Sequence, residues 1–154
     1  MERELNARST GGLNVADMKL FLTQKIKLSE DIMPIVIAGQ IDLESGKNRD
    51  KVIDSAKPYI EASWDEDGCI AYDWTADPFK DNRIHVFEEW ADEKSLAAHL
   101  VGQPYLDMLG HLQGAGIAST RAQKYRVDLI EPVYDDTGTP RADFYSLISG
   151  RARA

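Results

Sequence analysis

The chain is poor in the residues that build disulfides and metal centres. Cys69 is the only cysteine among the 154 residues, and the histidines are limited to His85, His99 and His111. A single cysteine excludes an intrachain disulfide and a multi-cysteine metal site. The spacing of the histidines matches no common pattern of metal ligands. We therefore predict no structural metal.

Positive charge and long apolar runs are also scarce. Lys and Arg number 18 against 26 Asp and Glu, which gives a formal net charge of -8. This excess of negative charge opposes binding to nucleic acid or to an anionic membrane. Apolar stretches such as residues 35–38 are far shorter than the roughly 20 residues that span a bilayer, and the N-terminus lacks the apolar core of a signal peptide. We expect a cytoplasmic protein without a nucleic-acid or membrane partner.

The signatures of nucleotide cofactors and of nucleophilic hydrolases are missing. Gly114-Ala115-Gly116 lacks the third glycine and the preceding strand of a dinucleotide-binding turn. No Gly-x-Ser-x-Gly element is present either. We predict no cofactor.

The pattern that is present predicts one α+β domain of the ferredoxin-like, split β-α-β kind. Hydrophobic residues make up 43% of the chain, which suits a folded core. Alternation of apolar and polar residues predicts strands, and apolar residues at helical spacing predict helices. The expected strands cover 34–43, 69–75, 83–90 and 122–132, and the expected helices cover 48–63 and a broken segment over 92–116. This order gives a four-stranded antiparallel sheet with helices on one face.

Segments of weaker periodicity flank this domain. We divide the chain into an N-terminal extension over 1–33, the ferredoxin-like domain over 34–132 and a C-terminal extension over 133–154. Two helices cover only one face of the sheet, and an uncovered sheet face usually contacts a partner. Dimerisation is the simplest way to cover it.

The strand at 83–90 places a carboxylate among apolar side chains. Alternation puts Glu88 on the same face as Val86 and Trp90. If this face meets the helices, Glu88 must find a partner or its pKa must rise. Its spacing fits a proton-transfer group and also fits a structural residue bonded to a core side chain or to the backbone.

A histidine and several aromatic residues are further candidates for a site. His99 follows an apolar helical stripe, and it fits a catalytic role or an ordinary packing role. Trp90, Tyr72 and Tyr105 fit walls of a ligand site and also fit core aromatics.

Four sequence segments together resemble the antibiotic biosynthesis monooxygenase family of the dimeric α/β-barrel superfamily. The resemblance covers about two thirds of the chain, from Pro34 to Pro132. It rests on Ile35-Val36-Ile37-Ala38-Gly39, Glu66-Asp67-Gly68-Cys69-Ile70-Ala71-Tyr72, Phe87-Glu88-Glu89-Trp90 and His99-Leu100-Val101-Gly102-Gln103-Pro104-Tyr105.

This resemblance implies a homodimer with a pocket between each sheet and its helices. It further implies oxygenation of a small aromatic substrate, such as a phenol, a hydroquinone or a polyketide-like compound, by O2 without metal or flavin. His99 is then expected to act as the base or as a hydrogen-bond partner of the substrate, and Glu88 to orient or tune it. Trp90, Tyr72 and Tyr105 are expected to frame the substrate.

Two alternatives stay open. Related barrels degrade haem with a strand-one asparagine, a tryptophan and a helix histidine; Trp90 and His99 match, but the first strand has Ala38, Gly39 and Gln40 in place of the asparagine. The other alternative is a dimer that binds or senses a small molecule without chemistry, because a fold does not determine a reaction.

Overall fold

The computed structural model of the protein describes residues 33–144. These residues form four strands and three helices. In chain order they are β1 (Ile35–Leu43), α2 (Arg49–Trp64), β2 (Cys69–Ala76), β3 (Arg83–Trp90), α3 (Glu93–His99), α4 (Gln103–Ala115) and β4 (Ile117–Arg126). The broken helical segment of the sequence is the pair α3 and α4. The predicted order of elements is confirmed.

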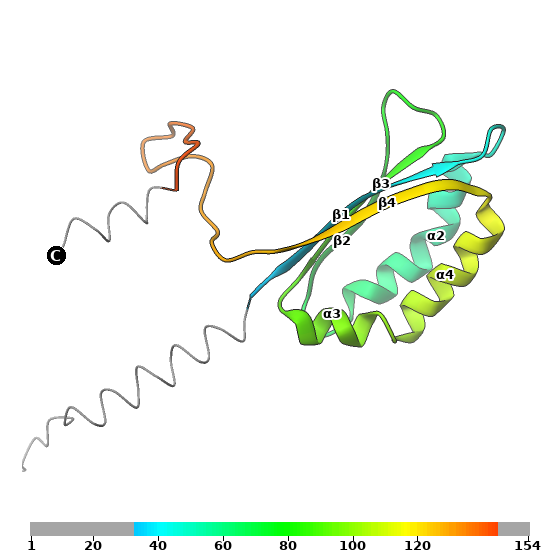
Figure 1. The fold of residues 1–154 in the computed structure, drawn as a ribbon, viewed down its shortest axis with the longest axis horizontal. Coiled ribbons are helices and arrows are strands. Elements are labelled where there is room, and N and C mark those ends of the chain that lie inside the picture. Colours follow the sequence, from blue (N-terminus) through cyan, green and yellow to red (C-terminus); the bar gives the residue numbers. More distant parts are fainter. Residues whose placement is uncertain (1–32, 145–154) are drawn as a thin grey trace, which may run out of the picture. The chain divides into compact units, whose positions relative to one another are not determined.

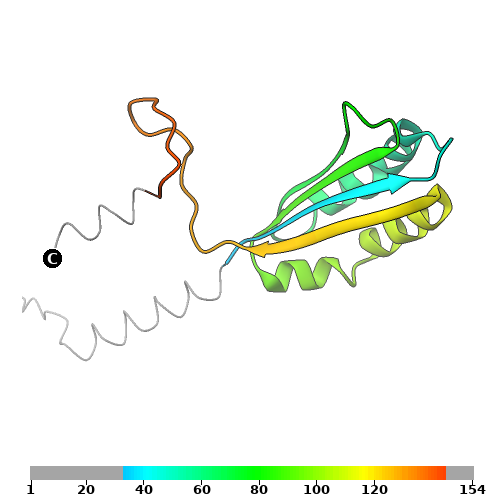
Figure 2. The ribbon, with the colours of Figure 1, turned by 45° about the horizontal axis from the view of Figure 1, so that its top comes forward.

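The strands form one antiparallel sheet in the order β2-β3-β1-β4. Helices α2, α3 and α4 all lie on the same side of this sheet (Figures 1 and 2). This arrangement confirms the predicted α+β, ferredoxin-like class.

The side of the sheet that faces the helices carries the core. Ile35, Ile41 and Leu43 of β1 are buried there beside Ile84 and Trp90 of β3. Their period of two puts every second side chain of each strand on this face. Helix α2 packs against β2 and α4, and it begins where the side chain of its N-cap Asn48 accepts a hydrogen bond from a backbone N–H.

The predicted range of the last strand, 122–132, is wrong at both ends. Gly116 ends α4 with a φ of 74°, and β4 starts at the next residue. From residue 118 onward β4 is exposed on both faces, so it needed no apolar alternation and gave no such signal. It stops at Arg126 because that residue pairs with Ile35, the first residue of β1, and no partner strand continues beyond it.

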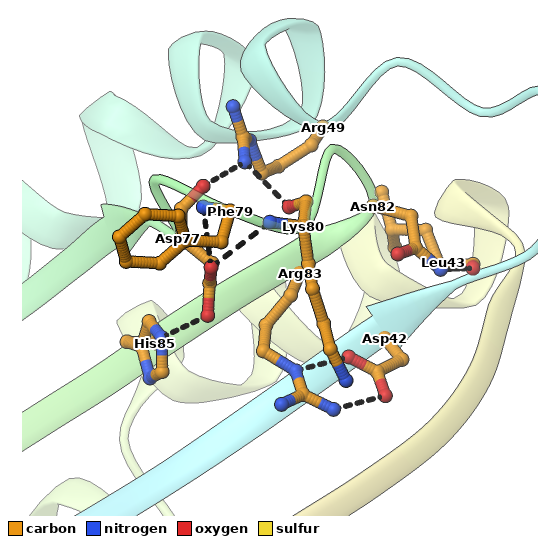
Figure 3. Close-up of polar contacts among 9 residues, drawn as sticks. All are labelled: Asp42, Leu43, Arg49, Asp77, Phe79, Lys80, Asn82, Arg83 and His85. Carbon is orange, nitrogen blue, oxygen red and sulfur yellow. Dashed lines mark hydrogen bonds and ion pairs between the residues drawn. The ribbon is translucent and has the colours of Figure 1, made fainter.

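The hairpin between β2 and β3 is fastened to the start of α2 (Figure 3). Arg49 Nη1 donates hydrogen bonds to the carbonyl oxygens of Asp77 and Lys80, at 2.7 and 2.8 Å. The Asp77 carboxylate accepts from the backbone N–H groups of Phe79 and Lys80 and lies 2.7 Å from Nε2 of His85. These contacts fix the tip of the hairpin, on which the Phe79 side chain is 93% exposed.

This turn predicts a pH-dependent contribution to stability. The backbone N–H of Phe79, and then the contact with His85, hold the pKa of Asp77 below its ordinary value. An acid whose pKa is lowered by folding stabilises the protein above its unfolded pKa, and this contribution disappears as the pH falls through the folded pKa. We expect Asp77→Ala to lower the melting temperature at pH 7 and to have little effect well below about pH 4. Asp81→Ala is the control, because Asp81 lies in the same turn and its side chain makes no hydrogen bond within 33–144. An equal loss for Asp77→Ala at both pH values would contradict the prediction.

The two predicted extensions lie largely outside the described residues. Residues 1–32 and 145–154 belong to them, and the predicted boundaries at 33 and 133 stay predictions. The described part of the C-terminal extension contains a short bridge between Tyr134 and Pro140, closed around the carboxylate of Asp135. Within 33–144 no helix is both long and apolar enough to cross a membrane.

Candidate functional site

His99 lies at the centre of the candidate site. It is the last residue of α3, and only 1% of it is exposed. Asp92 starts this short helix by accepting a hydrogen bond from the backbone N–H of Ser95, at 2.7 Å. The helix therefore ends with the imidazole directed into the protein.

Three aromatic rings enclose this imidazole. The ring centroids of Trp90, Tyr105 and Tyr72 lie 4.4, 5.2 and 5.3 Å from that of His99. The three residues come from β3, α4 and β2, and their rings meet at tilted or edge-on angles. We call His99, Trp90, Tyr105 and Tyr72 the ring cluster. The structure thus brings together four residues that the sequence singled out separately.

Glu66 is the hydrogen-bonding partner of His99. Its Oε2 lies 2.5 Å from His99 Nδ1, a contact across 33 positions of the sequence. The sequence analysis did not give Glu66 a site role. The one available signal was its place in the segment 66–72 that carries the family resemblance.

The loop that carries Glu66 is packed tightly against α3. Gly68 has a φ of 81°, which side chains disfavour, and a Cβ at this position would collide with the side chain of Ser95. The carbonyl oxygen of Gly68 accepts a hydrogen bond from the backbone N–H of Ala91, at 2.8 Å. Glycine at 68 thus lets the loop approach the helix that ends in His99.

Glu88 is buried, but its hydrogen bond is made with Trp90 and not with His99. Its carboxylate accepts a hydrogen bond from Trp90 Nε1 at 3.0 Å, while the Nδ1 of His99 is bonded to Glu66. Burial raises the pKa of Glu88, and the Trp90 hydrogen bond and nearby His99 act in the opposite direction. Glu88 therefore acts on His99 through its charge, whereas Glu66 orients the ring.

The second imidazole nitrogen of His99 has no hydrogen-bond partner among the residues that the structure describes. His99 Nε2 is buried and makes no hydrogen bond within residues 33–144, and the same holds for Trp74 Nε1. A carboxylate only accepts hydrogen bonds, so this contact calls for a proton on Nδ1, and in a neutral ring Nε2 would then carry a free lone pair. The nearby phenol of Tyr72 is no competing base, because burial and then the charge of Glu88 raise its pKa far above the ordinary value.

Hollows on the surface lie away from these groups. One of about 690 Å³ lies beside the 45–50 turn and Asp81, and one of about 310 Å³ lies over Ala38 and Arg121 of the sheet. Neither of these two hollows is lined by the ring cluster. Tyr105 is the half-buried member of the cluster, so a ligand would enter past it. Within the described part of the chain, no group of three or more His, Cys, Asp or Glu side chains could hold a metal ion.

The fold and these residues match a known family. The family model of the antibiotic biosynthesis monooxygenases (ABM) matches residues 34–109. The chain contains an ABM domain. The match runs from β1 into α4 and includes Glu66, Glu88 and every member of the ring cluster.

A curated protein is similar in sequence to this chain. An uncharacterized protein of Synechocystis is 34% identical over 84 residues, which are 52% of this chain and 56% of that protein. The chain therefore matches little more than half the length of this curated relative.

Solved structures share the fold. A conserved protein of unknown function from Bacteroides thetaiotaomicron, named a possible oxidoreductase, is 26% identical with a TM-score of 0.54, and the match covers 61% of this chain and 97% of that one. A protein from Nitrosomonas europaea, provisionally named an antibiotic biosynthesis monooxygenase, is 17% identical with a TM-score of 0.57 over 66% of this chain and 96% of its own. At such low identity the second likeness concerns the fold alone.

Proposed function

We propose that the ABM domain catalyses oxygenation of a small electron-rich aromatic compound by O2, with His99 Nε2 as the base. The observation that carries the proposal is this nitrogen, which is buried and has no hydrogen-bond partner within residues 33–144, while the other nitrogen of the same ring is bonded to Glu66. A buried polar group without a hydrogen-bond partner is rare in a native structure and calls for an explanation such as a catalytic role. The ABM match supports the reaction class.

The proposed reaction begins with removal of a proton. The hydroxyl group of a phenol or hydroquinone would donate its proton to His99 Nε2, and the resulting anion would transfer an electron to O2. Recombination and loss of water place one oxygen atom in the product as a carbonyl group and release the other as water. The substrate supplies all four electrons, so the balance requires no external reductant.

The surroundings of His99 favour this chemistry. Low local polarity strengthens the attraction between an imidazolium and a nearby carboxylate. Glu66 at Nδ1 and the buried Glu88 both lie where they would stabilise the protonated ring. Trp90, Tyr72 and Tyr105 supply flat apolar surfaces that suit an aromatic substrate.

The proposal is tested by oxygen uptake. Purified, metal-stripped protein would be mixed with a panel of hydroquinones and anthrone-like phenols, and O2 consumption would be followed with an electrode. We expect uptake above the buffer rate for at least one compound, with formation of a quinone that contains one oxygen atom more than the substrate. Uptake at the buffer rate for the whole panel would contradict the proposal.

A second candidate is a domain that binds a small molecule without chemistry. The hydrogen bond between Glu88 and Trp90 favours it, because it gives the buried carboxylate a structural role. A ligand that raises the melting temperature without any oxygen consumption would support this candidate.

We also propose that the domain works as a homodimer through the sheet face that the helices leave open. Ala38, Phe87 and Tyr125 are exposed on this face. It is also self-complementary in charge, since Asp73 lies on β2 and Arg121 on β4, and neither side chain has an ion-pair partner within 33–144. A twofold axis parallel to the strands would place β4 of one copy over β2 of the other.

The proposed dimer interface can be tested by placing one charged side chain on the open sheet face. Phe87→Asp is expected to convert the dimer to a monomer, because it buries an unpaired carboxylate in the interface. Light scattering after size exclusion measures the mass. Leu106→Asp is the matched control, because Leu106 is exposed on α4, away from the open face. A dimer that persists in Phe87→Asp would contradict this interface.

A further inference from the structure

We propose that Glu66 is a positioning residue that holds His99 in the tautomer with its proton on Nδ1, and that Gly102 provides the space for the Glu66 carboxylate. The inference concerns the same site, and it rests on the proposed function only for its effect on turnover. The tautomer itself can be measured without a substrate.

The first step of the argument is the pairing of donors and acceptors. Glu66 Oε2 lies 2.5 Å from His99 Nδ1, and the His99 side chain is 1% exposed. With the proton on Nε2 instead, two lone pairs would face each other at Nδ1, and a buried N–H would have no acceptor. Each unsatisfied buried polar group costs about 1–3 kcal/mol, so both features favour the proton on Nδ1.

The second step is that the backbone places Glu66 without help from His99. The N–H of Glu66 donates to the carbonyl oxygen of Ser63, and the carbonyl oxygen of Glu66 accepts from the N–H of Cys69. The positive φ of Gly68 completes this turn. The backbone of residue 66 is therefore held beside α3 by contacts that do not involve His99.

The third step concerns Gly102, which lies three residues after His99. Its φ of -73° and ψ of 156° suit any residue, so its conformation does not call for glycine. A Cβ at this position would lie 2.9 Å from Oε1 of Glu66 and 3.2 Å from the carbonyl oxygen of His99. Glycine at 102 thus leaves room for the Glu66 carboxylate and for the carbonyl oxygens of Ala98 and His99.

The test is the tautomer of His99 in protein labelled with ¹⁵N-histidine. Long-range ¹H–¹⁵N spectra distinguish a protonated ring nitrogen from a bare one, and His99→Gln identifies the signals of His99 among the three histidines. We expect wild type to show one tautomer, with Nδ1 protonated and Nε2 bare. Glu66→Ala should lose this single state. Glu66→Gln should give a mixture, because an amide can accept from Nδ1 or donate to it.

Two further variants complete the test. Gly102→Ala should displace the carboxylate and weaken the preference in the same direction as Glu66→Ala. Asp67→Asn is the matched control, since it removes the neighbouring acid of the same loop, and it should keep the wild-type spectrum. A wild-type protein with its proton on Nε2 would overturn the inference, and so would a Glu66→Ala spectrum identical to that of wild type.

The effect on turnover is a separate readout. Where a substrate is turned over, Glu66→Ala is expected to lower kcat by about 10- to 100-fold with little change in KM, a smaller loss than removal of the base itself. If no substrate is turned over, the proposed reaction is contradicted. The inference about the tautomer is still tested by the ¹⁵N spectra, which require no substrate.

Discussion

Replacing His99 with alanine is expected to lower kcat/KM for oxygen uptake by about 10²- to 10⁴-fold, the usual contribution of a positioned general base. The physical reason is that Nε2 of His99 has no hydrogen-bond partner within 33–144 and can accept a proton. The neighbouring Tyr72 cannot replace it, because the pKa of its phenol is raised far above the ordinary value and the phenol stays protonated. The initial rate of O2 consumption, measured against substrate concentration, separates kcat from KM.

A matched histidine variant guards against a general effect on folding. His111 lies on α4, where its Nε2 contacts the carbonyl oxygen of Val52 and the hydroxyl of Ser55, outside the ring cluster. We expect His111→Ala to keep turnover within a few fold of wild type. Full turnover in His99→Ala would remove His99 from the catalytic role.

Strand β3 shows which part of the site local periodicity could predict. Its predicted bounds are those of the structure, and the alternation placed Glu88 and Trp90 on the face that the helices cover. This works because a half-buried strand must separate its apolar and polar side chains onto two faces. The pattern also required a partner for the buried Glu88, and the structure supplies the indole N–H of Trp90.

The hydrogen bond between Glu66 and His99 shows what periodicity could not predict. The two residues lie 33 positions apart, on a loop and at the end of a helix, and neither position belongs to a repeating pattern. Their contact depends on how closely the loop at Gly68 packs against α3, which is a property of the tertiary structure. The strand β4 was misplaced for the related reason that an exposed edge strand needs no apolar face.

Replacing Trp90 with alanine is expected to lower the free energy of unfolding by about 3–5 kcal/mol, the usual cost of removing a large buried aromatic side chain. Trp90 is fully buried and is the largest such side chain in the described residues. Its loss would empty the centre of the ring cluster and would leave the Glu88 carboxylate without its N–H donor. Urea denaturation at pH 7 measures the change. Trp64→Ala is the control, because that indole is 54% exposed and should cost much less. A loss below about 1 kcal/mol for Trp90→Ala would contradict this account.

Trp90→Phe isolates the hydrogen bond to Glu88 from the packing of the ring. Burial raises the pKa of Glu88, so its ionised form destabilises the fold once the pH exceeds the ordinary value of about 4.3, and the indole N–H limits this cost. Without that donor the pKa rises further. We therefore expect a penalty of about 1.5–3 kcal/mol for losing this bond at pH 7. It should shrink as the pH falls toward 4 and Glu88 takes up its proton in both folded and unfolded states. A penalty that stays constant between pH 4 and pH 7 would show that packing alone sets the effect, and that the ionised Glu88 does not depend on Trp90.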